Sequence, residues 1–153
     1  MLYENILNEY SNSHLIIKEK DLPINKGRIK GNKIAIRRNL STKEKGCVLA
    51  EELGHYYTTV GNILEQSDVG NRKQELNARL WAYDKMIGLE GIIKSYKHGC
   101  RNLYETAEYL DVAEGFLKDA LIAYQNKYGT HVKYGNFVII FIPTLDVKSI
   151  DSL

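Results

Sequence analysis

The residues best placed to carry out chemistry lie in one short string, Glu51-Glu52-Leu53-Gly54-His55. The string differs from the metal-binding pattern His-Glu-x-x-His only in having Glu51 where the first histidine stands. Helical residues four positions apart lie about 40° apart around the axis and one turn apart along it, so Glu51 and His55 can face one metal ion. Glu52 is then free to act as a general base. The string therefore predicts a metal site with hydrolytic chemistry.

A catalytic metal of this kind needs a third protein ligand and an open position for water. Glu75 is the best candidate, because it lies 20 residues after His55 and one turn into a second predicted helix. Ala78 in that helix would let the two helices approach closely. Glu65 and Asp68, in the loop between the helices, are alternatives for the same ligand.

The donor set Glu51, His55 and Glu75 bears on which metal binds. Two carboxylates and one imidazole leave less positive charge on the ion than one carboxylate and two imidazoles. The pKa of bound water should then fall less than in good zinc sites. Carboxylates are also harder ligands than imidazole. We therefore expect Zn²⁺, with Mn²⁺ or another divalent metal as the alternative.

The helix that carries the string has a clear start. Ser41-Thr42-Lys43-Glu44 matches a capping box, in which the Ser41 hydroxyl accepts from the Glu44 N–H and the Glu44 carboxylate reaches back. The helix should begin at Ser41 and end near Thr59 to Gly61. Its broad apolar face, which suits the core, consists of Val48, Leu49, Leu53, Tyr56 and Val60.

Periodicity and turn residues predict the other elements. Gly31-Asn32 favours a β-hairpin across Arg28–Arg37, and an extended peptide could add as a strand to its Lys33–Ile36 edge. A second helix should run from Asn71 to about Ile87, with Gly88 as its stop. The other expected elements are a helix at Leu2–Asn8, an extended piece at Leu15–Ile17, a connection at Ser95–Asn102, helices at Leu103–Leu110 and Ala113–Tyr128, and a hairpin joining His131–Tyr134 to Phe137–Ile142. The predicted class is α+β.

Length and composition limit the range of functions. With 153 residues, of which 44% are apolar and 26% charged, the chain can bury one sizeable core. We therefore predict a single domain over residues 1–153, with the first hairpin and the site helices in 1–90 and the C-terminal helices and hairpin in 91–153. The net charge of +2 comes from 21 basic and 19 acidic residues spread along the chain, which argues against a nucleic acid partner.

The sequence also bears on compartment. The N-terminus lacks the basic start and cleavage site of a secretory signal, and no apolar run approaches the roughly 20 residues that span a bilayer. Two cysteines, Cys47 and Cys100, fit a reducing compartment, so we expect a cytoplasmic protein without a membrane partner. His14, His98 and His131 lack partner spacing and are interpreted as surface or hydrogen-bonding residues, and Cys100 beside His98 only weakly supports a nucleophile.

The order of these features resembles the ImmA/IrrE metallopeptidases. The hairpin Gly27–Ile36 leads through Leu40-Ser41 into Cys47-Val48-Leu49-Ala50-Glu51-Glu52-Leu53-Gly54-His55-Tyr56, and a helix carrying Glu75 and Ala78 follows. The resemblance implies a zincin-like single domain, in which a small sheet packs on the central active-site helix. It further implies that Glu52 is the catalytic base, that His55 and Glu75 are metal ligands, and that Glu51 stands in for the missing one. Family members cleave a helix-turn-helix repressor of a prophage or mobile element, which implies such a repressor as the substrate.

Two other functions stay open at this point. Because Glu51 departs from the family pattern, the protein could be a catalytically inactive zincin that acts by binding its repressor partner. Glu105–Leu121 also has the pattern of a helix-turn-helix DNA-binding module. Its presumed recognition helix, Ala113–Asp119, carries two acids and a single lysine, and the phosphates of DNA would repel it.

Overall fold

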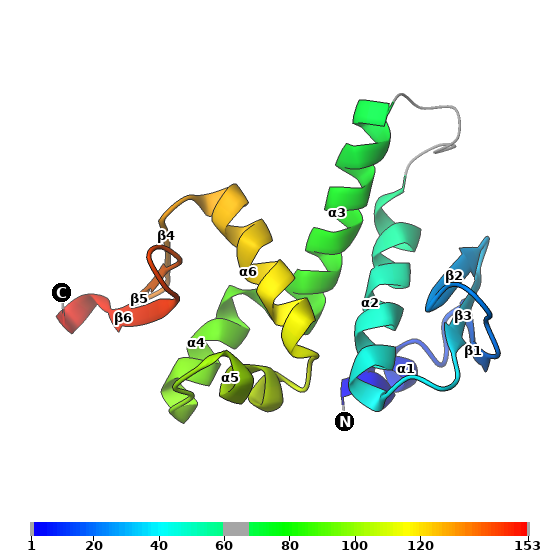
Figure 1. The fold of residues 1–153 in the computed structure, drawn as a ribbon, viewed down its shortest axis with the longest axis horizontal. Helices are drawn as coiled ribbons and strands as arrows, with labels where there is room; N and C mark the ends of the chain where they lie inside the picture. Colours follow the sequence, from blue (N-terminus) through cyan, green and yellow to red (C-terminus); the bar gives the residue numbers. More distant parts are fainter. Residues whose placement is uncertain (1, 60–67, 153) are drawn as a thin grey trace. The chain divides into compact units, whose positions relative to one another are not determined.

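The computed structural model describes residues 2–59 and 68–152, and for residues 68–71 it describes the backbone alone. Tertiary contacts divide the chain into two compact units, Met1–Lys85 and Met86–Leu153, and each unit is described by itself. The two units together contain helices and two three-stranded sheets, which confirms the predicted α+β class (Figure 1). Whether the whole chain is a single domain stays a prediction.

The sheet of the first unit has the strand order β1-β3-β2, with β1 at Ile16–Lys20, β2 at Gly27–Lys30 and β3 at Lys33–Arg37. β2 and β3 form the predicted antiparallel hairpin, and Gly31 in its turn has a φ of 61°. β1 pairs with the other side of β3 in parallel. The prediction that Lys33–Ile36 forms a free edge is therefore wrong, because β3 is the central strand and the edge of the hairpin is β2.

The sheet packs on α2, which spans Thr42–Thr58. The Ser41 side chain accepts from the Glu44 N–H, so the predicted capping residue is confirmed. Ile34 and Ile36 of β3 are 2% and 0% exposed, and they turn the inner face of the sheet toward the helix. α2 contributes its own apolar residues to this core, among them Cys47, Val48, Leu49, Ala50 and Leu53.

Two more helices complete the first unit. α1, Leu2–Glu9, packs on α2 and buries Tyr3 and Ile6. α3, Asp68–Met86, begins three residues earlier than predicted. In Figure 1, α2 lies between the sheet and α3. Val60 and Glu65, which the sequence placed at the end of α2 and in the following loop, lie outside the described residues.

Two part-buried polar contacts tie β1 to α1 and α2. The Glu19 carboxylate of β1 accepts from the Tyr3 hydroxyl at 2.9 Å and pairs with the Lys45 ammonium at 2.8 Å. The hydrogen bond from Lys45 is the main cause that lowers the pKa of the Glu19 carboxyl. The first unit therefore holds its sheet on α2 by charge as well as by apolar packing.

The second unit contains three helices and a second sheet. Its helices are α4 at Gly88–His98, α5 at Leu103–Leu110 and α6 at Glu114–Tyr128. Its antiparallel sheet has the order β4-β5-β6, at His131–Tyr134, Phe137–Ile140 and Asp146–Ser149, and a short 3₁₀ helix η2 follows at Ile150–Ser152. The two C-terminal helices and the second hairpin are confirmed. The Ser95–Asn102 connection is wrong for its first four residues, because α4 continues to His98 and ends at Gly99, whose φ is 96°.

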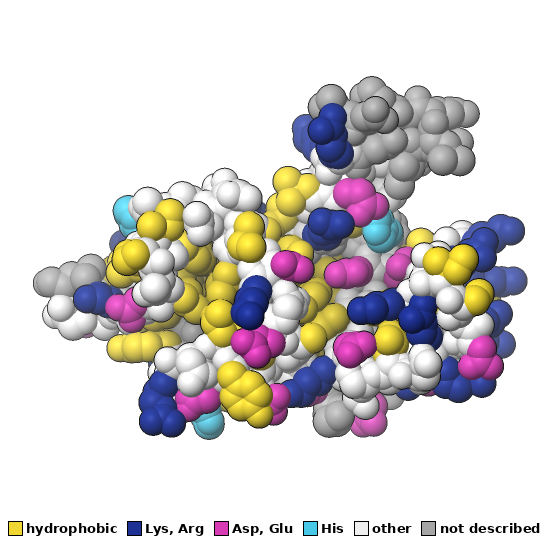
Figure 2. Space-filling view, viewed as in Figure 1, with side chains coloured by type: hydrophobic (Ala, Val, Ile, Leu, Met, Phe, Trp, Pro, Cys, Tyr) yellow, Lys and Arg dark blue, Asp and Glu magenta, His cyan; other side chains and the backbone are white. Residues whose placement is uncertain are grey.

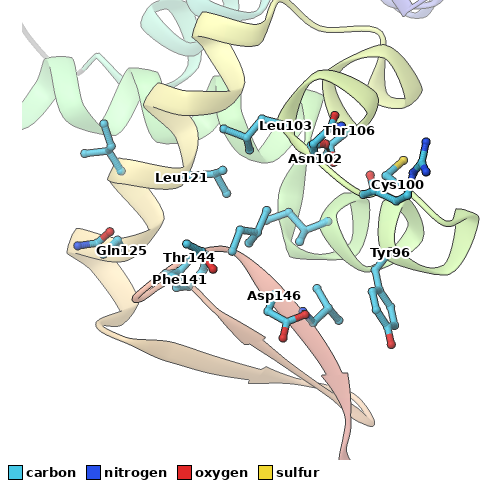
Figure 3. A pocket seen from close by; sticks show the side chains of 16 residues that line it. Tyr96, Cys100, Asn102, Leu103, Thr106, Leu121, Gln125, Phe141, Thr144 and Asp146 are labelled. Carbon is cyan, nitrogen blue, oxygen red and sulfur yellow. Dashed lines mark hydrogen bonds between the residues drawn. The ribbon is translucent and has the colours of Figure 1, made fainter.

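A pocket with a cavity volume of about 610 Å³ lies within the second unit. Figure 3 shows Leu121 and Gln125 of α6 on one side of it, Tyr96 of α4 on another, and Phe141 and Asp146 on the β5–β6 side. None of the predicted site residues lines this pocket. None of the described helices is both long and apolar enough to cross a bilayer.

Candidate active site

The contact between α2 and α3 is made at a glycine. A Cβ at Gly54 would lie 2.2 Å from the carbonyl oxygen of Ala78, so α3 occupies the space that a side chain would need. Ala78 is 1% exposed and faces this contact. The predicted close approach at Ala78 is therefore confirmed, and Gly54 is the residue on α2 that permits it.

This contact brings His55 and Glu75 together. His55 directly follows Gly54, and Glu75 lies one turn before Ala78. The His55 Nε2 atom and the Glu75 Oε1 atom are 3.5 Å apart. An imidazole nitrogen and a carboxylate oxygen at this separation are donors that zinc and manganese both accept. The pair fits two ligand positions of a divalent ion.

Glu52 lies beneath the first residue of β2. A Cβ at Gly27 would come within 3.0 Å of the Glu52 Oε1 atom and 2.5 Å of a Val48 methyl carbon, so the backbone of β2 covers this carboxylate. Burial, and then the negative charges of Glu51 and Glu75, raises the pKa of Glu52 to about 7. Near neutral pH the carboxyl is therefore present in both protonation states, as a group that takes up and returns a proton must be.

A groove runs between β2 and α2, with a cavity volume of about 560 Å³. One wall consists of Gly27, Arg28, Ile29 and Gly31, from β2 and its turn. The other wall consists of Glu52, His55, Tyr56 and Thr59, from α2 and its C-terminal end. The candidate base and one candidate ligand therefore face the same open space beside an edge strand.

Aromatic residues gather at the C-terminal end of α2, where Tyr56 lines the groove. The ring of Tyr57 stacks on Trp81 of α3 with a centroid distance of 5.5 Å, and it is tilted against the ring of Tyr10 at 6.1 Å. The Tyr56 hydroxyl, at the groove wall, is a hydrogen-bond partner of His14 Nε2. No local pattern predicts this pairing, because His14 lies 42 residues away in a segment without a motif.

The predicted ligand set is only partly assembled. Within residues 2–59 and 68–152, no group of three or more His, Cys, Asp or Glu side chains is arranged so as to hold a metal ion. Glu51 is close enough to Glu52 to raise its pKa, but the structure does not place it in a group with His55 and Glu75. Of the alternatives in the loop, Glu65 and the side chain of Asp68 lie outside the described residues.

A small sheet packed on a helix that carries a half-buried glutamate and a histidine is typical of a zincin-like α+β protein. In agreement, residues 7–121 match the family model of the IrrE N-terminal-like domain, Peptidase_M78. The match covers well over half of the chain. The chain therefore belongs to the ImmA/IrrE family of metallopeptidase-like proteins.

Comparison with curated proteins adds only a local likeness. Translation initiation factor 6 from three strains of Methanococcus maripaludis (C5, C6 and S2) is 34% identical to this chain over 58 residues. The match covers 37% of this chain, and the chain spans about a quarter of the length of these relatives, 26%. No solved structure matches the chain at a significant level.

Substitution of Gly54 should move Glu75 of α3 away from His55 of α2, while α2 itself stays helical. The Cβ of Gly54→Ala would collide with the Ala78 carbonyl, so α3 must move away from α2. We expect a loss of about 1–3 kcal/mol in the free energy of unfolding, as for other overpacked cores. Gly115→Ala in α6 is the matched control, because a Cβ there meets nothing within 4 Å and helix propensity alone should stabilise by up to about 1 kcal/mol. Urea denaturation measures both, and equal effects of the two variants would contradict the close-contact account.

The raised pKa of Glu52 should make the metal-free protein less stable at higher pH. The folded-state pKa of about 7 lies above the unfolded value of 4.5, so this carboxyl destabilises the folded state above pH 7 and has no such effect below pH 4.5. Glu52→Gln should remove a cost of roughly 2 kcal/mol, a figure discounted for the solvent that still reaches the group. Urea denaturation in chelator at about pH 5 and about pH 8 tests this, since only the wild type should lose this increment. An identical loss in the variant would assign the pH dependence to other groups.

Proposed function

We propose that this protein is a metal-dependent endopeptidase that cleaves a helix-turn-helix repressor. The observation that carries the proposal is the geometry of the groove. Glu52 and His55 line it beside an edge strand, and Glu75 lies 3.5 Å from His55. Membership of a peptidase family supports the reaction type.

The residues that would hold the metal are His55 and Glu75, with Glu51 as the third ligand. A divalent ion bound there would supply Lewis-acid polarisation of a water molecule and of the scissile carbonyl group. Glu51 and His55 are one helical turn apart on α2, so both lie on the same side of this helix. Zn²⁺ is the expected ion, with Mn²⁺ as the alternative.

Glu52 would move the proton during hydrolysis. Its carboxylate takes a proton from the attacking water, whose oxygen forms a bond to the carbonyl carbon. The same carboxyl then gives that proton to the amide nitrogen as the carbon–nitrogen bond breaks. Burial of this carboxyl beneath Gly27 raises its affinity for the proton that it carries between the two steps.

The free edge of β2 would align the substrate. The Arg37 N–H donates to the Lys26 carbonyl, which makes Lys26 and Arg37 a hydrogen-bonded pair of the hairpin. Because such pairs alternate, the N–H and C=O groups of Gly27 and Ile29 point away from β3 and toward the groove. An extended peptide can add there as a further strand. This placement replaces the Lys33–Ile36 edge expected from the sequence.

The proposed substrate is a repressor protein and not DNA. In the helix-turn-helix reading of Glu105–Leu121, Lys118 was the single cation of the presumed recognition helix. The structure pairs its ammonium with the Glu114 carboxylate at 3.6 Å. This pairing gives α6 no free cation at its start with which to bind phosphate, and it favours an interpretation of α5 and α6 as packing elements.

A binding-only function is the second candidate. The observation that favours it is the lack of a three-residue ligand group within the described part of the chain, together with Glu51 at the position of a histidine. In this case the groove would hold the repressor without hydrolysing it. The two candidates differ in whether metal content and peptide cleavage depend on Glu51 and Glu52.

Two variants on α2 separate these candidates. Protein purified without chelators should contain about one metal per chain by elemental analysis, and it should cleave helix-turn-helix repressors from the same genome. Glu52→Gln should keep the metal and lose about 10² to 10⁴ in rate, because only the general base is removed. Glu51→His should raise zinc affinity and keep or raise the rate of cleavage, because a neutral ligand replaces an anionic one.

The control for both variants is Glu90→Gln, which removes a carboxylate from the exposed surface of α4 and should change neither property. If the wild type binds a repressor without cleaving it and only Glu51→His cleaves, the binding-only function holds for the natural protein. If metal content and cleavage stay unchanged in all three variants, Glu51 and Glu52 take no part in metal binding or hydrolysis.

A further inference from the structure

The outer face of the first sheet is almost entirely cationic. Side chains alternate along each strand, and Ile34 and Ile36 of β3 point inward, so Lys33, Ala35 and Arg37 point outward. The strand register places outward residues of β1 and β2 beside them. The basic residues of this face, here called the basic sheet face, are Lys18, Lys20, Arg28, Lys30, Lys33 and Arg37. Ile16 and Ala35 fill the other outward positions, and no acid lies among them.

The net charge of residues 16–38, which contain the first sheet, differs in sign from the net charge of the rest of the chain. Residues 16–38 contain eight Lys and Arg and two Asp and Glu, a net charge of +6, whereas the whole chain has +2, which leaves −4 elsewhere. Figure 2 shows the Lys and Arg side chains gathered over β1, β2 and β3. Of the two acids, Glu19 faces inward to Lys45, and Asp21 pairs with Arg38 at 3.4 Å.

Most cations of the basic sheet face are not compensated by the protein. Within residues 2–59 and 68–152, the side chains of Lys18, Lys20, Arg28, Lys30 and Lys33 make no hydrogen bond or ion pair. Like charges this close repel one another, and a partner with negative charge would relieve that repulsion. The basic sheet face therefore favours an anionic partner.

The basic sheet face continues directly into the groove, because Arg28 belongs to both. A peptide added as a strand along β2 would turn every second side chain to the same side as Arg28 and Lys30. On the free edge, Arg28 occupies a non-hydrogen-bonded position, since its own backbone groups pair with β3. Side chains across such a position lie closest together, so opposite charges there attract most strongly.

The remaining side chains of the same peptide would face a negatively charged part of the groove. They would turn inward under β2, where the half-buried Glu52 carboxylate lies against Gly27. An acidic side chain there would meet a second carboxylate and lose part of its hydration, so uncharged side chains are favoured at these inward positions. The groove therefore distinguishes outward from inward positions by the sign of the charge that each one meets.

We propose that the segment bound in this groove carries Asp or Glu at alternate positions, facing Arg28 and Lys30, with uncharged residues between them. The inference rests on the proposed function in taking the groove to hold an extended peptide. A single-stranded nucleic acid fits the basic sheet face less well, because its outward residues include no aromatic side chain on which bases could stack.

Binding of short fluorescent peptides to the full-length Glu52→Gln variant tests the proposal without cleavage. Three peptides are compared by fluorescence anisotropy: one with alternating acids, one with the corresponding amides, and one with the same composition but contiguous acids. We expect the alternating peptide to bind on the order of tenfold more tightly than the amide peptide, and more tightly than the contiguous one. Equal affinity of the alternating and amide peptides would overturn the proposal.

Charge reversal on each of the two edge strands shows which strand binds the acidic side chains of the peptide. Arg28→Glu with Lys30→Glu on β2 should abolish the preference for alternating acids. Lys18→Glu with Lys20→Glu on β1 is the matched control, because it makes the same change in charge on the edge strand away from the groove. The control should lower affinity for all acidic peptides and leave the preference for alternation. Equal effects of the two double variants would contradict recognition along β2.

Two further measurements separate this inference from the proposed function and from nucleic acid binding. Cleavage of the same peptides is followed with the wild-type protein: equal cleavage of the alternating and amide peptides overturns this inference alone, and no cleavage with a retained binding preference overturns the peptidase alone. Duplex DNA is titrated at the same salt concentration. Tighter binding of DNA than of the alternating peptide, lost on reversal of Arg28 and Lys30, would assign the basic sheet face to nucleic acid.

Discussion

The close approach of α2 and α3 is the constraint on which the candidate site depends. Side chains usually keep packed helix axes about 8–10 Å apart. At Gly54 there is no side chain, and the Ala78 carbonyl oxygen lies 2.2 Å from the position that a Cβ would take. His55 and Glu75 flank this contact on the two helices, so its width fixes the separation of their side chains. Gly54 and Ala78, which carry no reactive group, therefore set the distance between the two candidate ligands.

A second glycine has the matching role on the other side of α2. Gly27 lets β2 lie against Val48 and Glu52, and the contacts of Glu19 with Lys45 and Tyr3 fix β1 on the same helix. This close packing removes part of the water around Glu52, and the loss of hydration is the largest cause of its raised pKa. α2 thus has a backbone neighbour on each side, and the groove forms where the edge of β2 leaves it open.

Most of the helices and strands that position the candidate site could be predicted from local patterns in the sequence. The Ser41 cap, the Gly31 turn and the alternation of Ile34 and Ile36 are local signals, and each predicted its element correctly. Contacts between segments that lie far apart in the sequence were not predicted. The parallel pairing of β1 with β3 joins segments separated by the whole of β2, so nothing near Lys33–Ile36 shows that this strand is central. The contact of His14 with Tyr56 is likewise made only by the fold. The first half of the connection predicted at Ser95–Asn102 is helical, because α4 buries Ile92 and Ser95 within the second unit.

The distribution of charge across β2 connects the two proposals. On its inner side, Glu52 lies near Glu51 and Glu75, and their mutual repulsion disfavours a further negative charge while favouring a cation or a proton. On its outer side, Arg28 and Lys30 favour a negative charge. A strand presents alternate side chains to these two sides, so a period of two in the charge of the bound segment matches the period of two in β geometry. The net charge of +2 conceals this arrangement, because charges of opposite sign that are separated by a single strand cancel in the sum. The pattern in space, and not the total, is what a bound peptide would meet.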